Sequence, residues 1–424
     1  MKKKGCFSYV LVALISSVAS LMLAGVLDTG SVTVPDLNPE PDWGLSEGED
    51  TGDDDSGQKD KTPDTGDSVP DDNSTLVSRS PVSCTYYYDQ MNREEKQIYD
   101  ALLQCVQKGE KSIKLENVEL ITYEDYCHRA AFGLTYDHPE LFWLKSGYSM
   151  SKRYNRTQGY GDITLEFMQY SYWDYSMDKT KKSKELADAV TKVANLARNK
   201  TSDYDVIQFV HDYLVENAIY DHDALNEFYK TYHNASCEYI FSAYGCLINK
   251  KTVCAGYAKA FQMIMQELGY ECIYVVGDAG GSHAWNCVFL EEEGYFVDIT
   301  WDDPDYTHDE PLYEYFCITN EALERTHELD DLFETPECDS DKYNYFVYNH
   351  YRMDTYSFEE AARIITAQSD QHIISVQFGS KREMKKAVED LMSYGKIKNI
   401  PAIKKPGDIR YSQNEDHFTL TIYQ

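Results

Sequence analysis

Three side chains in the middle of the chain are of types that cooperate in nucleophilic catalysis: Cys254, His283 and Asp298. In that chemistry a thiolate attacks an acyl carbon, an imidazole accepts and returns the proton, and a carboxylate fixes the imidazole tautomer. Each residue type is also common in structural roles, because a lone cysteine usually fills a core and lone histidines or aspartates are frequent at strand ends. The elements that carry the three residues therefore decide whether they form a site.

Cys254 is expected at the start of a helix. The segment KKTVCAGYAKAFQMIMQELGY begins with a turn-like lysine pair, continues at helical spacing and ends at Gly269, a natural C-terminal stop. The apolar residues that share one face are Tyr257, Ala258, Phe261, Ile264, Met265 and Leu268. At a helix N-terminus, unpaired N–H groups and the helix dipole favour a negative charge, and the thiolate is the reactive form of cysteine.

An oxyanion formed at this cysteine needs hydrogen-bond donors. The backbone N–H of Cys254 is expected to supply one, since the start of a helix leaves it free. The second donor stays open among Trp285, Gln262 and Asn234. Gly256 is expected to leave room for the close approach of a substrate backbone.

Three strands are expected around the histidine and the aspartate. Cys272–Val276 and Ala284–Leu290 are separated by the flexible sequence GDAGGS, which puts His283 at the start of the second strand. The sequence EEEG then makes a hairpin connection into Tyr295–Trp301, which contains Asp298.

The pairing of the last two strands sets the distance between histidine and aspartate. If Leu290 faces Tyr295, then Asp298 faces Cys287, and strand parity places both on the same side of the sheet as His283 and Trp285. That pairing leaves Asp298 offset along the strands from His283. A twist, a bulge or a shorter turn must close the gap.

Three successive segments resemble the motifs of the transglutaminase-like superfamily: VCAGYAKAF, GDAGGSHAWNCV and GYFVDITWDDP. In that family a cysteine opens a helix, a histidine begins a strand in an HAWN-like sequence, and an aspartate ends a VDxTW-like strand. The resemblance implies a catalytic triad of Cys254, His283 and Asp298. The resemblance is specific across about residues 245–305. It is looser upstream, through the segment VIQFVHDYLVENAIYD. The flanking regions look like those of uncharacterised exported bacterial members.

The resemblance also implies a fold and a range of activities. The fold class is α+β, with a papain-like transglutaminase core in which the cysteine helix packs on an antiparallel sheet. A helical and β-containing N-terminal region and a small C-terminal α/β unit would flank this core. Family members include cross-linking enzymes, deamidases, peptidases and copies that have lost activity.

The composition along the chain and the family resemblance together predict five segments. These are a signal peptide or signal anchor (1–27), a disordered acidic stalk (28–80), an N-terminal α/β region (81–180), a transglutaminase-like catalytic domain (181–345) and a small C-terminal α/β domain (346–424). The stalk is rich in Asp, Gly, Pro, Ser and Thr, so it cannot bury enough apolar surface to offset the entropy of ordering.

The N-terminus is typical of an export signal. Lys2, Lys3 and Lys4 precede an apolar run from Phe7 to Leu27, about long enough to span a bilayer. Positive charge before the run favours an N-terminus on the inside, so the folded part is expected outside the cell, either secreted or membrane-anchored. No clear cleavage site decides between a removed signal peptide and a single retained anchor.

The overall charge limits the classes of partner. Asp and Glu outnumber Lys and Arg by 72 to 40, a net charge of −32, which argues against nucleic acid and against docking on anionic lipid. We expect a protein or peptide substrate at the cell surface, while the oligomeric state is left open. The thirty-six tyrosines are expected to fill cores and cover surfaces, not to bind sugars.

No cofactor or metal is expected. The eleven cysteines show no zinc spacing, and most are interpreted as small buried apolar residues. The run TWDDPDYTHDE could suggest calcium, but it has no recognisable ligand spacing and is interpreted as a solvated loop.

Capping patterns predict further helices. Three pairs have capping-box spacing, namely Asn92 with Glu95, Ser357 with Glu360, and Ser380 with Glu383. Ser202 is expected to cap another helix. Strands are expected at Ile373–Phe378 and, as an edge or half-buried strand, at Phe418–Tyr423.

The favoured hypothesis is an extracellular cysteine enzyme that acts on peptide or glutamine amides through a thioester. Cys254 would form the acyl-enzyme, His283 would act as acid and base, and Asp298 would orient His283. Cross-linking, deamidation and proteolysis remain open, because they differ only in what resolves the intermediate. The rival hypothesis is a catalytically inactive adhesion or scaffold module at the cell surface.

Overall fold

A computed structural model of the protein describes residues 79–155, 158–170, 178–231, 235–304, 310–404 and 409–424. The expected signal segment 1–27 and residues 28–78 of the expected stalk lie outside the described residues. Within the described part of the chain, no helix combines the length and the apolar character needed to cross a bilayer.

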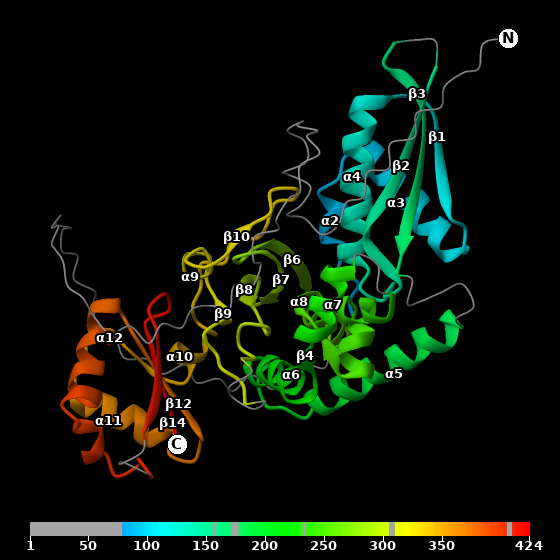
Figure 1. Ribbon diagram of the computed structural model, residues 1–424. Coiled ribbons are helices and arrows are strands. Elements are labelled where there is room, and N and C mark those ends of the chain that lie inside the picture. The colour runs from blue at the N-terminus through cyan, green and yellow to red at the C-terminus, as the bar shows by residue number, and fades with distance from the viewer. Residues whose placement is uncertain (1–78, 156–157, 171–177, 232–234, 305–309, 405–408) are drawn as a thin grey trace.

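The first described part of the chain forms a three-stranded antiparallel sheet with helices on it (Figure 1). Its elements are α2 (Tyr86–Asp89), α3 (Arg93–Gln107), β1 (Ser112–Glu119), α4 (Leu120–Asp137), β2 (Leu144–Tyr154) and β3 (Tyr160–Gln169), and the strand order is β1-β3-β2. The capping box of Asn92 and Glu95 is confirmed, since each side chain accepts a hydrogen bond from the backbone N–H of the other.

The centre of the molecule is a five-stranded antiparallel sheet with strand order β10-β6-β7-β8-β9. The strands are β6 (Cys272–Asp278), β7 (Ser282–Leu290), β8 (Glu293–Val297), β9 (Phe316–Ile318) and β10 (Glu328–Leu329). Helix α8 (Cys254–Glu267) packs against β6 and β7. The expected α+β class, with the cysteine helix on an antiparallel sheet, is therefore confirmed.

Helices surround α8 on its other sides, and α5 and α6 contact it directly. The elements before it are α5 (Lys179–Ala197), α6 (Asp203–Asn217), β4 (Ile219–Tyr220), α7 (His222–Thr231), the 3-10 helix η1 (Ala235–Phe241), the π-helix η2 (Gly245–Asn249) and β5 (Lys251–Thr252). The expected cap of α6 is confirmed, because the Ser202 side chain accepts from the backbone N–H of Asp205. Two short helices come later in the chain: α9 (Asn320–Leu323) between β9 and β10, and α10 (Tyr345–Tyr348) after β10.

Both faces of the central sheet are buried. Val288, Tyr295 and Val297 belong to a hydrophobic cluster with residues of α5, α6 and α8. On the opposite face, Trp285 and Cys287 belong to a second cluster, with residues of α3, α4, β2 and β3. The sheet therefore lies between two layers, which makes its strands rigid supports for polar groups at their ends.

The hairpin between β7 and β8 is tighter than the EEEG sequence suggested. Leu290 pairs with Glu293 rather than with Tyr295, so the turn consists of Glu291 and Glu292, which have φ values of 51° and 69°. Both residues adopt the left-handed conformation that a two-residue hairpin turn with the correct twist requires. The expected Leu290–Tyr295 pairing is wrong, and the shift of two residues brings Asp298 closer to His283 without changing its face of the sheet.

The C-terminal unit has its own four-stranded sheet, at the opposite end of the molecule from β1–β3 (Figure 1). Its elements are β11 (Arg352–Met353), α11 (Phe358–Ala367), β12 (Ile373–Phe378), α12 (Lys381–Val388), the π-helix η4 (Glu389–Ser393), the 3-10 helix η5 (Lys396–Asn399), β13 (Arg410–Asn414) and β14 (Thr419–Tyr423), in strand order β11-β12-β14-β13. The N-caps Ser357 and Ser380 and the strand Ile373–Phe378 are confirmed.

The last strand differs from expectation, because β14 is central and almost entirely buried. Its alternating threonines suggested a solvated face, but each finds a polar partner inside the protein. The hydroxyl of Thr421 lies 3.0 Å from that of Ser375, and Thr419 donates to the buried carboxylate of Glu314. Hydrogen bonding within the core thus satisfies side chains that would otherwise need water.

Strand β10 is an edge strand of the central sheet and pairs with β6 at Gly277. Glu328 pairs with Asp278, Leu329 pairs with Gly277, and Gly277 in turn pairs with His283 of β7. A Cβ atom at Gly277 would lie 2.1 Å from the Glu328 carbonyl oxygen and 2.7 Å from the Trp285 ring. The missing side chain at Gly277 is therefore what allows β10 to approach β6 so closely.

We expect Gly277→Ala to push β10 away from β6 and to lower the free energy of unfolding by about 1–3 kcal/mol, the usual cost of overpacking. Denaturant unfolding followed by circular dichroism measures this change. Gly281→Ala is the matched control, because a Cβ atom there meets nothing within 4 Å. Equal stability of the two variants would contradict the packing argument.

Candidate active site

The thiol of Cys254 lies at the open end of a helix. Cys254 is the first residue of α8, and the preceding Val253 is extended and provides no side-chain cap. Among the ten cysteines that the structure describes, nine are buried and Cys254 alone is partly exposed. This confirms both the expected helix start and the expected burial of most other thiols.

A buried amide fixes the cysteine helix to the sheet. Asn286 of β7 is 1% exposed, and its Nδ2 donates to the carbonyl oxygens of Ala258 and Ile273, at 3.0 Å in each case. One acceptor lies near the start of α8 and the other in β6. Because Asn286 follows His283 by three residues on the same strand, this link sets the position of the thiol relative to the imidazole.

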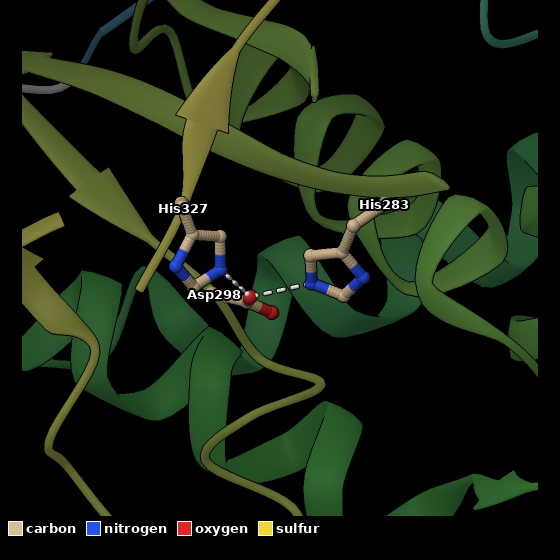
Figure 2. A group of neighbouring side chains, drawn as sticks. All are labelled: His283, Asp298 and His327. Carbon is tan, nitrogen blue, oxygen red and sulfur yellow. Dashed lines mark hydrogen bonds and ion pairs between the residues drawn. The ribbon is translucent and has the colours of Figure 1, made fainter. Parts of the chain in front are cut away.

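His283 and Asp298 meet, as the chemistry requires. Nε2 of His283 lies 2.6 Å from Oδ2 of Asp298, the contact dashed in Figure 2. Both side chains are buried. The structure thus brings together two of the three predicted residues by a direct hydrogen bond. The Cys254 side chain contributes to the raised pKa of His283, which indicates that the thiol lies near the ring.

Asp298 is held by the turn that follows its strand. The expected strand Tyr295–Trp301 is too long, since β8 ends at Val297. Oδ1 of Asp298 accepts from the backbone N–H groups of Thr300 at 2.9 Å and Trp301 at 3.3 Å. An aspartate that bonds the backbone of the next residues forms a tight turn instead of continuing a strand. That turn leaves Oδ2 free to face His283.

The charges of the pair stabilise each other. Burial disfavours the imidazolium, but the Asp298 carboxylate and then the Cys254 side chain outweigh it and raise the pKa of His283 from 6.5 to about 10. Burial also disfavours the carboxylate, yet charge and hydrogen bonds from His283 and His327 hold the pKa of Asp298 well below its ordinary value. The site therefore favours an imidazolium beside a carboxylate, the form that supports a thiolate.

A residue that the sequence analysis did not identify, His327, lies on the other side of Asp298. Its Nε2 is 3.1 Å from Asp298 Oδ2, the oxygen that His283 also contacts (Figure 2). His327 immediately precedes β10 and occurs in no recognisable motif. Only the antiparallel pairing of β10 with β6 brings it to the site, so no local signal could have found it.

The same three side chains have the donor types of a metal site. One ligand atom from each of His283, Asp298 and His327 lies within 4.8 Å of the others, and two imidazoles with a carboxylate suit zinc or iron(II). No metal was expected from the sequence. In the structure, both Nε2 atoms are engaged as hydrogen-bond partners of Asp298.

Two expectations about the oxyanion site are wrong. Gly256 gives no room to a substrate, because a Cβ atom there would lie 2.0 Å from Thr252 Oγ1 and 2.7 Å from the Ile240 carbonyl oxygen. Gln262 is no oxyanion donor, because its Nε2 donates to the carbonyl oxygen of Tyr136 at 2.9 Å. Both residues serve the packing of α8 against its neighbours.

The indole of Trp285 stays a candidate donor. Its Nε1 is buried and has no hydrogen-bond partner in the described part of the chain, and its ring stacks on His283 with centroids 5.8 Å apart. Asn234 lies outside the described residues.

The acidic run after Asp298 is only partly what we expected. Asp302 is fully buried, where it lies 3.3 Å from Nε2 of His211 and accepts from the backbone N–H of Tyr315. A solvated loop is therefore the wrong interpretation for Asp302, which instead joins α6 to the segment before β9. Asp305 and Asp309 lie outside the described residues.

We expect Asp298→Asn to lower the pKa of His283, because the substitution removes the charge that raises it. In the parent, the stabilisation from this pair is complete below pH 6.5 and is lost as the pH rises through about 10. NMR titration of ring-labelled histidine measures the shift, with His283→Gln used for assignment. Asp303→Asn is the control, since Asp303 bonds Tyr257 rather than His283. An unchanged His283 titration in Asp298→Asn would contradict the assignment.

The segment that holds these residues is similar to a known family. A family model described as the transglutaminase-like superfamily matches residues 190–299, which contain Cys254, His283 and Asp298. A mouse protein, the kyphoscoliosis peptidase, is 27% identical over 149 residues; the match spans 31% of this chain and only 21% of the mouse protein.

A solved structure described as a TGase is also similar, at 18% identity over 45% of this chain and 50% of that one, with a TM-score of 0.27. That similarity is too low to bear on function. The similarity that carries weight is that of residues 190–299, which match the transglutaminase-like superfamily.

Proposed function

We propose that this protein is a cysteine enzyme that acts on peptide or glutamine amides through a thioester at Cys254. One observation carries the proposal. Cys254 begins α8 beside the ring of His283, while Nε2 of that ring is held 2.6 Å from the buried carboxylate of Asp298. Nucleophile, base and orienting group are thus arranged in the order that acyl transfer needs.

The first half of the reaction forms the acyl-enzyme. The thiolate of Cys254 attacks the amide carbon, and the negative charge moves to the carbonyl oxygen. The imidazolium of His283 then gives its proton to the leaving nitrogen as the carbon–nitrogen bond breaks. The products of this half are a free amine or ammonia and a thioester on Cys254.

The second half releases the acyl group. Neutral His283 removes a proton from water or from an acceptor amine, which attacks the thioester carbon, and the carbon–sulfur bond breaks. The thiolate and the imidazolium are restored together. Throughout, Asp298 keeps the Nε2–H of His283 directed toward itself, so that the other ring nitrogen serves the thiol.

The acceptor separates hydrolysis from cross-linking. Water gives proteolysis or deamidation, whereas an amine gives a new amide bond. The mouse relative is called a peptidase, which favours water. Water is therefore the first acceptor to test. A test is needed because the identity is low and only a small share of the mouse protein is matched.

The proposal also places the folded part of the protein outside the cell, as a secreted or anchored enzyme that meets its substrate there. Its support is the basic residues Lys2, Lys3 and Lys4 followed by the apolar run from Phe7 to Leu27. Protease added to intact cells should digest the folded part. Protection equal to that of a cytoplasmic marker would oppose this location.

We expect iodoacetamide to alkylate Cys254 faster than any other cysteine of the described residues, because it is the only partly exposed thiol among them and lies beside His283. Peptide mass spectrometry of the folded, full-length chain gives the rate at each thiol. Cys254→Ser should abolish the fast phase. A Cys254 that reacts no faster than N-acetylcysteine would favour an inactive scaffold module.

We expect release of new amino termini or ammonia from casein by the parent, and no release by Cys254→Ala, since the covalent step needs the thiol. Dansylcadaverine added to the same reaction tests an amine as acceptor. Fluorescence incorporated into casein by the parent alone would assign cross-linking. Activity retained by Cys254→Ala would refute the thioester route.

A further inference from the structure

The second imidazole beside Asp298 has no part in the proposed reaction, yet it is built into the site. His327 is 4% exposed, and its ring centroid lies 5.5 Å from that of His283. Both rings point toward one oxygen, Oδ2 of Asp298, from opposite sides (Figure 2). An oxygen that accepts from two rings cannot turn toward one without loosening its contact with the other.

The hydrogen positions in this group follow from the ionised state of Asp298. A carboxylate can only accept, so Nε2 of His283 and Nε2 of His327 must each carry the donated hydrogen. The remaining nitrogen of His327, Nδ1, lies 2.8 Å from the hydroxyl of Thr326. That hydroxyl accepts in turn from the phenol of Tyr315, at 3.3 Å. A chain of donors therefore runs from Tyr315 through Thr326 to His327 and ends at Asp298.

We propose that His327 is a positioning residue: as a neutral imidazole it donates to Asp298 and so holds the carboxylate where it orients His283 for reaction at Cys254. This inference rests on the proposed function. Among the described residues, His327 has hydrogen-bond contacts to Asp298 and Thr326, so its effect on His283 is exerted through Asp298.

The positioning role requires that the His327 ring is neutral. The charged and titratable groups around His327 are Asp298, His283, His417 and Tyr315. Burial, the largest effect, disfavours a charge on His327 and lowers its pKa, although Asp298 opposes this. A neutral His327 gives Asp298 a hydrogen bond without a second positive charge, so the carboxylate charge remains available to His283.

The geometry favours this role over a metal site. A metal would need the lone pairs of both Nε2 atoms, and these atoms instead lie at hydrogen-bond distance from the same oxygen, 2.6 Å and 3.1 Å away. The hydroxyl of Thr326 and the N–H groups after Asp298 then satisfy the remaining polar atoms. The polar atoms of Asp298 and His327 thus all have hydrogen-bond partners without a metal ion.

Three variants of the full-length chain test the inference. His327→Gln keeps an N–H donor near Asp298, whereas His327→Phe fills the ring space without a donor. The matched control is His417→Phe, because His417 is also buried and packs 4.4 Å from the Tyr315 ring, while its Nε2 has no partner in the described residues. Circular dichroism confirms folding, and the readout is the pH dependence of Cys254 alkylation by iodoacetamide.

In His327→Phe we expect the rate at neutral pH to fall roughly 10- to 100-fold, the scale of a misoriented catalytic group, and the midpoint of the pH profile to rise. His327→Gln should recover most of the rate, and His417→Phe should match the parent. If His327→Phe reacts like the parent, or the glutamine variant is as slow as the phenylalanine variant, the positioning role is wrong.

A second measurement does not depend on reactivity. Nitrogen NMR of labelled histidine should show His327 as the neutral tautomer with hydrogen on Nε2. A charged ring, the other tautomer, or stoichiometric zinc that His327→Gln loses would overturn the inference, the last in favour of a metal site. A slow Cys254 in the parent refutes the proposed function, while the NMR result still decides whether His327 donates to Asp298.

Discussion

The carboxylate of Asp298 is 1% exposed, and a buried charge is tolerated only where hydrogen bonds and opposite charge replace the lost water. Four groups do so here. The backbone N–H groups of Thr300 and Trp301 hold Oδ1, and the rings of His283 and His327 hold Oδ2. The two N–H groups belong to the turn that Asp298 itself begins, whereas the two rings come from β7 and from the residue before β10, so the surrounding fold must bring both rings to the carboxylate.

Two features of the central sheet bring these donors to Asp298. The two-residue turn after Leu290 sets the register that brings the end of β8 level with the start of β7. Gly277 lets β10 approach β6, and that approach carries His327 to the carboxylate. Asn286 then ties α8 to the same strands, so the Cys254 thiol is positioned by the sheet rather than by a loop. The site is rigid because its parts share one support.

The C-terminal unit packs on Tyr315, behind the site and outside the catalytic group. His417, in the β13–β14 hairpin, packs on the ring of Tyr315, and Tyr315 donates to the Thr326 hydroxyl beside His327. Arg325 donates to the backbone of Asp416 and stacks on Phe418, which holds the hairpin in place. The unit has its own hydrophobic cluster, yet one of its turns forms part of the wall behind the second imidazole.

The sequence by itself determined the parts whose signals are local. Apolar periodicity and Gly269 define α8 and place Cys254 at its first residue, and strand parity puts Asp298 on the face of His283. Only the tertiary structure decided the turn length at Glu291 and Glu292, the packing role of Gly256 and the position of His327 beside Asp298. These depend on contacts between segments far apart in the chain, where burial and close packing override local preference.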